Sequence, residues 1–411
     1  MAIQIEAQYR LTTPLFCGGA VSSAAELRLP SFKGVLRFWW RALAWSRCEG
    51  NLALIQQQED QLFGSATGGQ ARVVMRLGSI SRLDPIAVGD VLKEARGDQQ
   101  VVGMGARYLG YGLMAAFPSA RTNTQAGQLS RGALQAPLQF TVQLRSSGLD
   151  PGLLESLLQA LIALGTLGGM GSRSRKGYGS LVIESLTVDG ESTAAREPWS
   201  APRNALELAG SIAELQQQAN RKGLPEYTAL SSSARHVVLT AEDSRGPLHL
   251  LDLVGREMVR YRSWGKDGKV LRDIPSEKNF RHDHDLMKKR SDQRRAHPER
   301  IAFGLPHNYG QGRFNEVSPA GLDRRASPLF IHIHSCASGP VAVLSFLPAR
   351  FLPASDAGSR AQIDVGGVTI PQKPEQELYQ PVHAFLDRLL DLGPAPKLRK
   401  EPFTTALEVT P

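Results

Sequence analysis

Residues 151–188, PGLLESLLQALIALGTLGGMGSRSRKGYGSLVIESLTV, contain the transition that decides the fold. Pro151 follows Asp150 and stands in a first helical turn, where its missing N–H is not needed, so a helix is predicted through LLESLLQALIAL. That helix stops in a basic glycine-rich loop, residues 165–180. The stretch GSLVIESLTV after the loop predicts a strand. The segment therefore predicts a helix, a basic glycine loop and a strand in direct succession.

The sequence before this segment supplies the other elements of a small α+β unit. Apolar and polar residues alternate through IQIEAQYR at residues 3–10, which is the pattern of a strand with one buried face. A helix opens at SFKGVLRFWWRAL, residues 31–43, and ARVVMRLGSI and LQFTVQLR predict two strands on either side of an insertion at roughly residues 85–137. The order strand, helix, strand, strand, helix, strand predicts a ferredoxin-like fold.

The second half of the chain repeats this order. The predicted elements are a strand at ARHVVLTAE, a helix at LLDLVGREMVRYR, strands at SPLFIHIHS and VAVLSFLPA, a helix at EQELYQPVHAFLDRLLDL and a short strand at TTALEVT. Each half also has a Phe-Gly pair after its first helix, Phe63-Gly64 and Phe303-Gly304. The expected fold class is α+β, with two tandem ferredoxin-like (RRM-related) βαββαβ domains that carry long insertions. A diverged duplication explains the repeat, and two unrelated α+β domains are the alternative.

The repeat and the composition define three predicted segments. An N-terminal domain covers residues 1–190 and includes the glycine-rich loop. A helical connector rich in Ala, Ser, Gln and Pro covers residues 191–230. A C-terminal domain covers residues 231–411 and includes a basic insertion at about 256–328. A length of 411 residues suits two domains.

Composition favours an intracellular protein with a polyanionic partner. The formal net charge is +9, which favours nucleic acid over a membrane surface. Cys17, Cys48 and Cys336 form no CxxC pair, so neither a disulfide framework nor a thiolate zinc site is indicated. The first residues do not resemble a signal peptide, and no apolar run has the length of a membrane span. A cytoplasmic localisation is therefore expected.

The glycine-rich loop is the strongest candidate site. Its six glycines let the backbone approach a ligand, and three cations in four positions supply charge, which an ordinary helix end would not need. It contains neither GxxxxGK[ST] nor GxGxxG, so nucleic-acid phosphates suit it better than a nucleotide cofactor. The candidate contacts in the loop are Gly168, Gly169, Gly171, Ser172, Arg173, Arg175 and Lys176.

The opening helix carries a cationic stripe. Lys33, Arg37 and Arg41 recur at i, i+4 and i+8, and Trp40 lies at the edge of the stripe. Cations beside an aromatic ring can neutralise phosphates and stack a base, so these four residues are candidate contacts. The alternative is a solvated face whose arginines pair with carboxylates elsewhere.

The segment from Arg256 to Arg300 holds fourteen Lys and Arg against eight Asp and Glu, and it predicts a phosphate track or a disordered basic arm. Candidate contacts here and in the later basic turn RRASP are Arg281, His282, His284, Arg294, Arg295, Arg324 and Arg325. The HDHD string at residues 282–285 has no partner ligands at a recognisable spacing. No metal, no other cofactor and no catalytic residue is therefore predicted.

Several of these stretches resemble a known family. PSFKGVLR resembles a signature that follows the first strand in RAMP-superfamily proteins, and GGMGSRSRKGYGS resembles their glycine-rich loop. FWWRAL, FGLP and RRASPL resemble one branch, the first-numbered subunits of the Cmr complex, which is the type III-B CRISPR RNA-guided effector. The likeness spans both halves. The last helix ends in DLGPAPKLRK without the full glycine loop, so no RNA contact is predicted there.

The resemblance implies a subunit without catalytic activity that binds guide RNA and target RNA and contacts other RAMP subunits. Such subunits cap the effector near the guide 3′ region and aid target capture in antiviral defence. The likeness adds Tyr178 as an RNA-contacting or loop-shaping residue, and it implies no membrane and no small-molecule cofactor. An endoribonuclease on the same fold is the alternative, with His282 and His284 as acid–base candidates. A scaffold that contacts only protein, through Tyr108 and Tyr111, is a third possibility.

Overall fold

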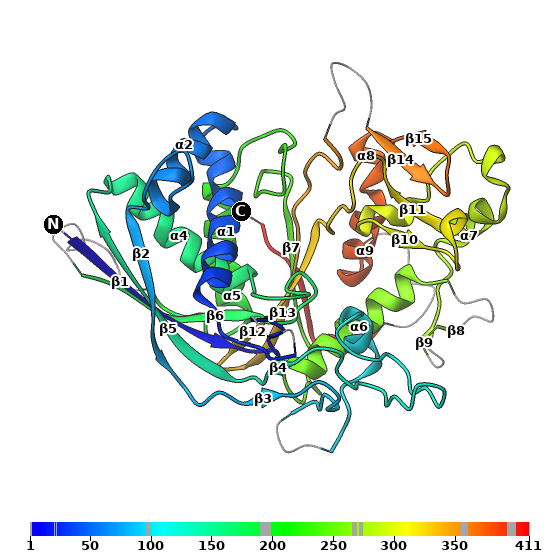
Figure 1. Ribbon diagram of the computed structural model, residues 1–411, viewed down its shortest axis with the longest axis horizontal. Coiled ribbons are helices and arrows are strands. Elements are labelled where there is room, and N and C mark those ends of the chain that lie inside the picture. Colours follow the sequence, from blue (N-terminus) through cyan, green and yellow to red (C-terminus); the bar gives the residue numbers. More distant parts are fainter. Residues whose placement is uncertain are drawn as a thin grey trace.

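The protein is known from a computed structural model, which describes residues 2–19, 21, 23–95, 99–189, 199–264, 269–270, 274–353, 361–392 and 400–410. Two four-stranded antiparallel sheets, one from each half of the chain, form its framework (Figure 1). Helices pack against both sheets. The α+β class predicted from the sequence is confirmed.

The first sheet has the strand order β2-β5-β1-β6. Its strands are β1 (Ala2–Leu11), β2 (Val73–Ile80), β5 (Leu138–Ser147) and β6 (Leu181–Asp189). In the central pair Tyr9 lies opposite Phe140 and Ala7 opposite Val142. All four of these side chains are buried, as expected for the inward face of alternating strands.

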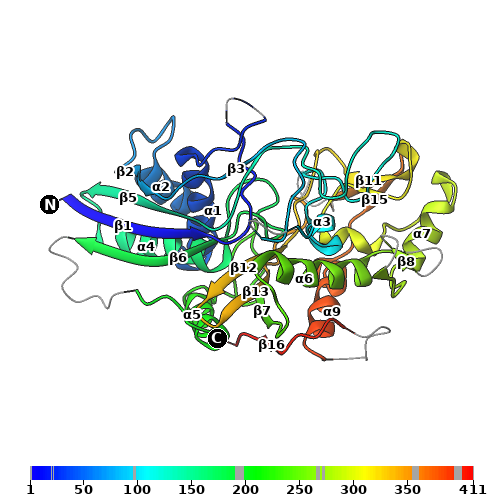
Figure 2. The same ribbon diagram turned by 90° about the horizontal axis from the view of Figure 1, so that it is seen from below.

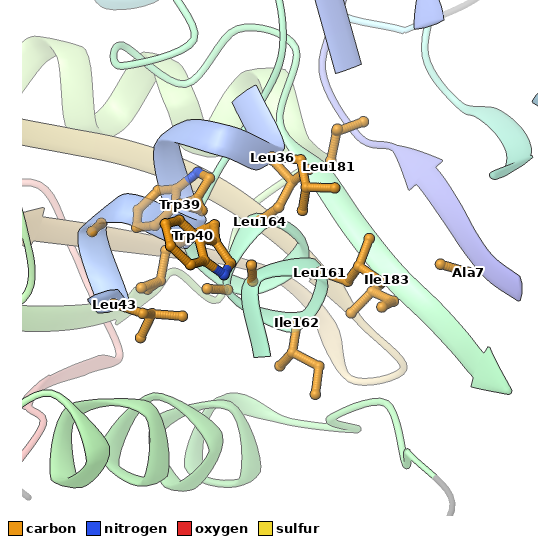
Figure 3. Close-up of a cluster of buried hydrophobic side chains, with 14 of the residues drawn as sticks. Ala7, Leu36, Trp39, Trp40, Leu43, Leu161, Ile162, Leu164, Leu181 and Ile183 are labelled. Carbon is orange, nitrogen blue, oxygen red and sulfur yellow. The ribbon is translucent and has the colours of Figure 1, made fainter. Parts of the chain in front are cut away.

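Two helices cover one face of this sheet. They are α1 (Leu29–Arg47) and α4 (Pro151–Leu167), which pack against each other (Figure 1). The Asp150 carboxylate caps α4 by accepting a first-turn backbone N–H at 2.9 Å. Trp39 and Trp40 enter the core beside α4, among aliphatic side chains of both helices and the sheet (Figure 3). The predicted helix and its start are therefore confirmed.

The second sheet has the strand order β12-β13-β7-β16. Its strands are β7 (Arg235–Thr240), β12 (Leu329–Cys336), β13 (Gly339–Phe346) and β16 (Thr405–Glu408). If the four strands of each half are counted along the chain, both sheets have the order second, third, first, fourth. Helix α6 (Pro247–Arg262) follows the first strand, and helix α9 (Gln380–Leu389) precedes the last, as α1 and α4 do in the first half.

Two expectations about the second half are corrected. The single helix predicted over residues 375–392 is two helices, α8 (Glu375–Leu378) and α9, because Pro381 lacks the N–H that would continue the first one. The basic insertion is folded over its described residues, where it forms α7 (Arg281–Lys288) and half of a third sheet. That sheet joins β10 (His307–Asn308), β11 (Glu316–Pro319), β14 (Gln362–Val365) and β15 (Thr369–Pro371).

The remaining elements are mostly short. They are α2 (Leu52–Phe63), β3 (Pro85–Ile86), α3 (Met104–Leu109), β4 (Ala133–Leu134), α5 (Ala205–Gln218), β8 (Lys269–Val270), β9 (Ile274–Pro275) and the 3-10 helices η2 (Ser291–Gln293), η3 (Glu299–Phe303) and η4 (Arg313–Asn315). Helix α5 lies in the predicted connector, whose residues 191–198 are outside the described ones, as are residues 393–399 of DLGPAPKLRK. No helix in the described ranges is long and apolar enough to cross a membrane.

The two halves meet along a boundary that we call the seam, where the glycine-rich loop lies against β12. The Ile331 N–H donates to the Arg175 carbonyl oxygen at 3.0 Å. The Thr12 hydroxyl donates to the Ile333 carbonyl oxygen at 2.5 Å. Both bonds bury polar groups of one half against the other, so the loop is part of the joint between the sheets.

Helix α3, from the insertion of the first half, also crosses the seam. It lies against α6 of the second half in Figure 2. The Asp252 carboxylate on α6 accepts the N–H groups of Gly105 and Ala106 at 2.6 and 3.1 Å. Gly105 and Gly255 allow the two helix backbones to touch, since a side chain on either would collide with the other helix.

Candidate nucleic-acid interface

The glycines of the loop serve close packing inside the protein. Gly171 and Gly179 have φ of 85° and 65°, a region that residues with a Cβ avoid. A Cβ on Gly171 would lie 2.6 Å from a backbone carbonyl oxygen, and one on Gly179 would collide with another. Gly168 and Gly169 are buried, so the prediction that they contact RNA is wrong. Gly171 and Ser172 are partly exposed and remain predicted contacts.

Tyr178 shapes the loop from inside. Its side chain is fully buried, and its hydroxyl donates to the Ala106 carbonyl oxygen of α3 at 2.8 Å. Its ring meets the Phe16 ring edge-on at 5.6 Å between centroids. Burial raises the pKa of Tyr178 well above its usual value, so the hydroxyl stays a donor. The RNA contact predicted for Tyr178 is therefore wrong, and its position fits the loop-shaping role.

Two arginines of the loop have different surroundings. Arg173 is exposed, and its Nε donates to the Tyr111 carbonyl oxygen at 2.8 Å. The Arg175 guanidinium is mostly enclosed, donates to the Ser327 carbonyl oxygen at 2.8 Å and lies 4.4 Å from the Phe330 ring centroid. Burial, assisted by a neighbouring arginine, lowers the pKa of Arg175 to about 10. Arg173 is therefore accessible to a ligand, whereas the contacts of Arg175 mainly connect the two halves of the chain.

Lys176 is the third cation of the loop. The stem of its side chain is partly exposed, but Nζ is buried and has no hydrogen-bond partner within the described residues. Burial, and after it the charges of Arg262, Arg173 and Arg175, lowers the pKa of Lys176 to about 7. Its amine therefore lies in a positively charged environment inside the seam.

Four exposed side chains surround this loop, and we call them the arginine rim: Tyr111, Arg131, Arg173 and Arg324. Partial burial, followed by the charges of Arg131 and Arg324, lowers the pKa of Arg173, and Tyr111 offsets part of this effect. The Tyr111 side chain is 73% exposed. An exposed ring beside uncompensated arginines can stack a base while the arginines contact phosphates.

The arginine rim combines predicted and unpredicted residues. Arg173 and Arg324 were predicted from separate motifs, and the fold brings them together across the seam. Arg131 was missed, because an isolated arginine in the insertion has no spacing pattern that distinguishes it. Tyr111 was noted only as an exposed aromatic of a protein scaffold. The neighbouring Arg325 is half-buried, with its guanidinium 5.8 Å from the Phe351 ring centroid, and remains a predicted contact.

The cationic stripe of α1 is largely compensated. Arg37 Nη2 lies 2.7 Å from Glu59 Oε1, and Arg41 Nη1 lies 3.7 Å from the same oxygen. Lys33 Nζ donates to the Phe63 carbonyl oxygen at 2.7 Å. Glu59 belongs to α2, a helix that the sequence analysis did not predict. The alternative, a face whose arginines pair with a carboxylate, describes Arg37 and Arg41, although both remain partly exposed.

Trp40 is not available to stack on a base. Its side chain is fully buried in the first core, where its indole N–H donates to the Ser156 hydroxyl at 2.9 Å (Figure 3). Its ring packs edge-on against Phe63 at 6.2 Å. The prediction that Trp40 contacts RNA is therefore wrong.

The predicted contacts on α7 lie apart from the cationic stripe of α1. Helices α1 and α7 are on opposite sides of the molecule in both views (Figures 1 and 2). Arg294 is buried, and its guanidinium donates to four backbone carbonyl groups at 2.8–3.2 Å, so the prediction that it contacts RNA is wrong. Arg281 and Arg295 are exposed and remain predicted contacts.

Within the HDHD string, the buried Asp283 has a structural role. Asp283 is fully buried, and its carboxylate accepts the N–H groups of Glu299 and Arg300 at 2.8 and 3.0 Å, which fixes the start of η3. The His284 ring stacks on Trp264 at 4.6 Å, and burial followed by nearby cations lowers the pKa of His284 to about 4. His282 is exposed and remains a predicted contact, as does the partly exposed His284. The described residues contain no group of three or more His, Cys, Asp or Glu able to hold a metal ion.

A family model described as the RAMP superfamily matches residues 8–182. This segment is similar to the RAMP superfamily. It runs from β1 to the start of β6 and contains the whole glycine-rich loop. The resemblance stated from the sequence is therefore confirmed where its most specific motif lies.

The chain is also similar to proteins from Pyrococcus furiosus. The protein named CRISPR system Cmr subunit Cmr1-1 is 28% identical over 340 residues, which are 80% of this chain and 82% of that protein. The protein named Cmr1-2 is 27% identical over 180 residues, 42% of this chain and 91% of that protein. The crystal structure of Cmr1 from Pyrococcus furiosus in its apo form covers 92% of this chain and 95% of that chain, with a TM-score of 0.50 and 19% identity. The last likeness shows a shared fold, and the predicted resemblance to the first-numbered Cmr subunit is confirmed.

Proposed function

We propose that this chain is a non-catalytic RNA-binding subunit of a type III-B CRISPR (Cmr) effector complex. The observation that carries the proposal is its likeness to Cmr1-1 over 82% of that protein. In this role the chain binds guide RNA and target RNA beside other RAMP subunits in the cytoplasm. It caps the complex near the guide 3′ region and helps to capture target RNA for antiviral defence.

We also infer that the two halves are tandem ferredoxin-like domains, with boundaries near residues 190 and 231. The identical strand order of the two sheets supports this. The Phe-Gly pairs support it too, because Phe63 and Phe303 are both buried and Gly64 and Gly304 both have positive φ, 73° and 114°. The same local geometry at matching places in two halves favours duplication over two unrelated domains.

The surface that suits RNA best is the arginine rim. Phosphate contacts carry most nucleic-acid affinity without reading sequence. The exposed guanidinium groups of the rim have no carboxylate partner among the described residues and are ready to make such contacts. Tyr111 offers a face on which any base can stack. The open face of the first sheet is a weaker candidate, because two of its cations already have partners: Arg10 pairs with Glu184 at 2.9 Å, and Arg76 donates to Gln143 at 2.7 Å.

Two measurements test the function. Purified chain is titrated with single-stranded RNA at several salt concentrations, and we expect salt-sensitive, largely sequence-independent binding. The tagged chain is also purified from cells with its partners, with and without ribonuclease, and we expect RAMP subunits and RNA to co-purify. A chain that binds no RNA and brings down no other RAMP subunit would contradict the proposal.

The histidines of α7 give an endoribonuclease little support. His282 Nε2 lies 3.3 Å from Asp283 Oδ1 and 3.1 Å from Glu299 Oε2. The Asp283 carboxylate also accepts two backbone N–H groups, and His284 is stacked on Trp264 with its pKa lowered by burial to about 4, so the two histidines do not form a matched acid and base. Incubation with labelled RNA, with and without divalent metal, checks this. Cleavage that disappears in His282→Ala would replace the non-catalytic assignment with an enzymatic one.

A further inference from the structure

Three cationic side chains and one histidine, drawn from both halves, converge beside the arginine rim, and we call them the seam cluster: Lys176, Arg262, Arg300 and His307. Lys176 comes from the glycine-rich loop, and the other three come from α6, η3 and β10 of the second half. Arg262 Nη2 lies 3.3 Å from His307 Nε2. Arg300 Nη1 donates to the Arg262 carbonyl oxygen at 3.2 Å. The cluster is therefore compact, and it exists only because the two halves are docked.

Several donors in the cluster have no acceptor. Lys176 Nζ, Arg262 Nε and Arg300 Nε are buried and have no hydrogen-bond partner in the described part of the chain. Leaving one buried donor unpaired costs about 1–3 kcal/mol, so such groups are rare in folded proteins. An anion that enters the cluster would supply an acceptor to these donors.

The cations of the cluster also act on one another. Arg262 acts on Lys176 and His307, and Arg300 acts on Arg262 and His307, whereas the phenol groups of Tyr108 and Tyr309 act on Arg262 in the opposite direction. Asp283 lies near, but its oxygens are already occupied by two backbone N–H groups and by the Tyr309 hydroxyl at 3.2 Å. Like charges brought together in a poorly solvated place repel strongly unless an anion joins them.

A row of aromatic rings borders the cluster and favours RNA over a free anion. Trp264 stacks on His284 at 4.6 Å, His284 lies 5.1 Å from Tyr309, and Tyr309 lies 6.3 Å from His307. All four rings are partly exposed, and the Arg300 guanidinium lies 4.6 Å from the Tyr309 centroid. Rings with accessible edges beside cations are the arrangement on which bases of single strands stack.

We propose that the seam cluster binds one phosphate group of an RNA strand and so holds RNA against both halves of the chain at once. This rests on the proposed function and deepens it. Lysine and arginine are the usual protein ligands of phosphate, and its oxygens would satisfy Lys176 Nζ and the two free guanidinium Nε groups. Arg173 is close enough to act on Lys176, so a strand that lies on the arginine rim can continue into the cluster.

The test compares matched variants of the full chain in RNA titrations over a range of salt. We expect Lys176→Met and Arg300→Gln each to weaken affinity about tenfold and to reduce the salt slope by about 0.7, the share of one single-strand phosphate. Arg203→Gln is the control, because Arg203 is exposed and paired with Glu207 on α5. Unfolding midpoints of each variant, measured without ligand, show that the fold is retained.

Inorganic phosphate forms the second arm and separates the two sources of the anion. We expect RNA to raise the unfolding midpoint of the natural protein more than inorganic phosphate does at the same phosphate concentration. If RNA binding is tight but unaffected by Lys176→Met and Arg300→Gln, the seam cluster is not a phosphate site, and the proposed function is retained. Stabilisation by inorganic phosphate equal to that by RNA overturns the RNA assignment. A natural chain with no RNA affinity defeats the proposed function itself.

Discussion

The stripe on α1 and the glycine-rich loop each contain three cations, yet among the described residues only the stripe pairs its arginines with a carboxylate. Arg37 and Arg41 on α1 share the buried carboxylate of Glu59. In the loop, Arg173 and Lys176 face further cations brought from elsewhere in the fold. Similar sequence patterns therefore have opposite electrostatic outcomes, and the carboxylate or arginine that decides the outcome comes from a different element.

This difference predicts that the glycine-rich loop is a better site for a polyanion than the stripe on α1. A polyanion that approaches α1 must compete with a carboxylate already in place, whereas one that approaches the loop relieves repulsion among cations. The loop should therefore dominate RNA affinity, and α1 should dominate local stability. The following substitutions are chosen to separate these two contributions.

Removing the arginine rim should have the largest effect. We expect Arg173→Gln with Arg324→Gln to weaken RNA binding about 100-fold at low salt, roughly 2.7 kcal/mol, because two exposed phosphate contacts are lost. Arg37→Gln with Arg41→Gln is the matched comparison on α1 and should change affinity less than about threefold. RNA titrations at several salt concentrations measure both, and equal losses in the two variants would remove the distinction between the regions.

Removing the carboxylate that pairs with the α1 arginines should affect stability and not RNA binding. Glu59 is 6% exposed, so Glu59→Gln leaves two half-exposed arginines without their shared partner. We expect the free energy of unfolding to fall by about 2 kcal/mol, a value reduced because the arginines still reach water. Urea unfolding checks this, with exposed Glu155→Gln on α4 as the control. An unchanged midpoint would show that the pairing contributes little.

Lys176 should make stability depend on pH. It faces Arg173, Arg175, Arg262 and His307, and burial with these neighbours gives its amine a pKa of about 7 in the folded protein. The unfolded chain, with an ordinary lysine pKa near 10.4, binds more protons between these values, so stability rises with pH from about 7 to 10. The destabilisation is fully present below pH 7.

Lys176→Met removes this destabilisation. We expect the free energy of unfolding to rise by about 1.5 kcal/mol at pH 6 and by much less at pH 9, because the folded lysine is then already neutral. Urea unfolding at the two pH values measures the difference. The exposed Lys222→Met serves as the control and should show no such pH dependence. A gain that is the same at both pH values would mean that packing, not charge, is responsible.

The sequence predicted the elements with strong periodicity and missed those defined by tertiary contact. The strands and helices of both sheets appear close to their expected positions, since alternation and caps such as Asp150 act locally. Helix α2 and the third sheet were missed. The break at Pro381 was overlooked within a pattern that otherwise reads as one amphipathic helix.

Only part of the candidate site was predicted, because much of it also depends on tertiary contacts. The glycine-rich loop was located, but whether each of its side chains faces solvent or the seam depends on residues of the other half. Tyr178 and Arg294 looked like ligand contacts and are buried, because backbone carbonyl groups far away in sequence accept their hydrogen bonds. Arg262 and His307 showed no local sign of their common location.

Trp40 gives the smallest and most specific test of the comparison. In the core its indole N–H donates to the Ser156 hydroxyl, so Trp40→Phe removes one buried hydrogen bond and some packing while keeping an aromatic ring. We expect a loss of about 1 kcal/mol in unfolding free energy and no change in RNA affinity. Tyr111→Phe, on the exposed rim, should leave both unchanged because stacking needs only the ring, whereas Tyr111→Ala should weaken RNA binding about tenfold with no loss of stability. An RNA defect in folded Trp40→Phe would return α1 to the binding surface.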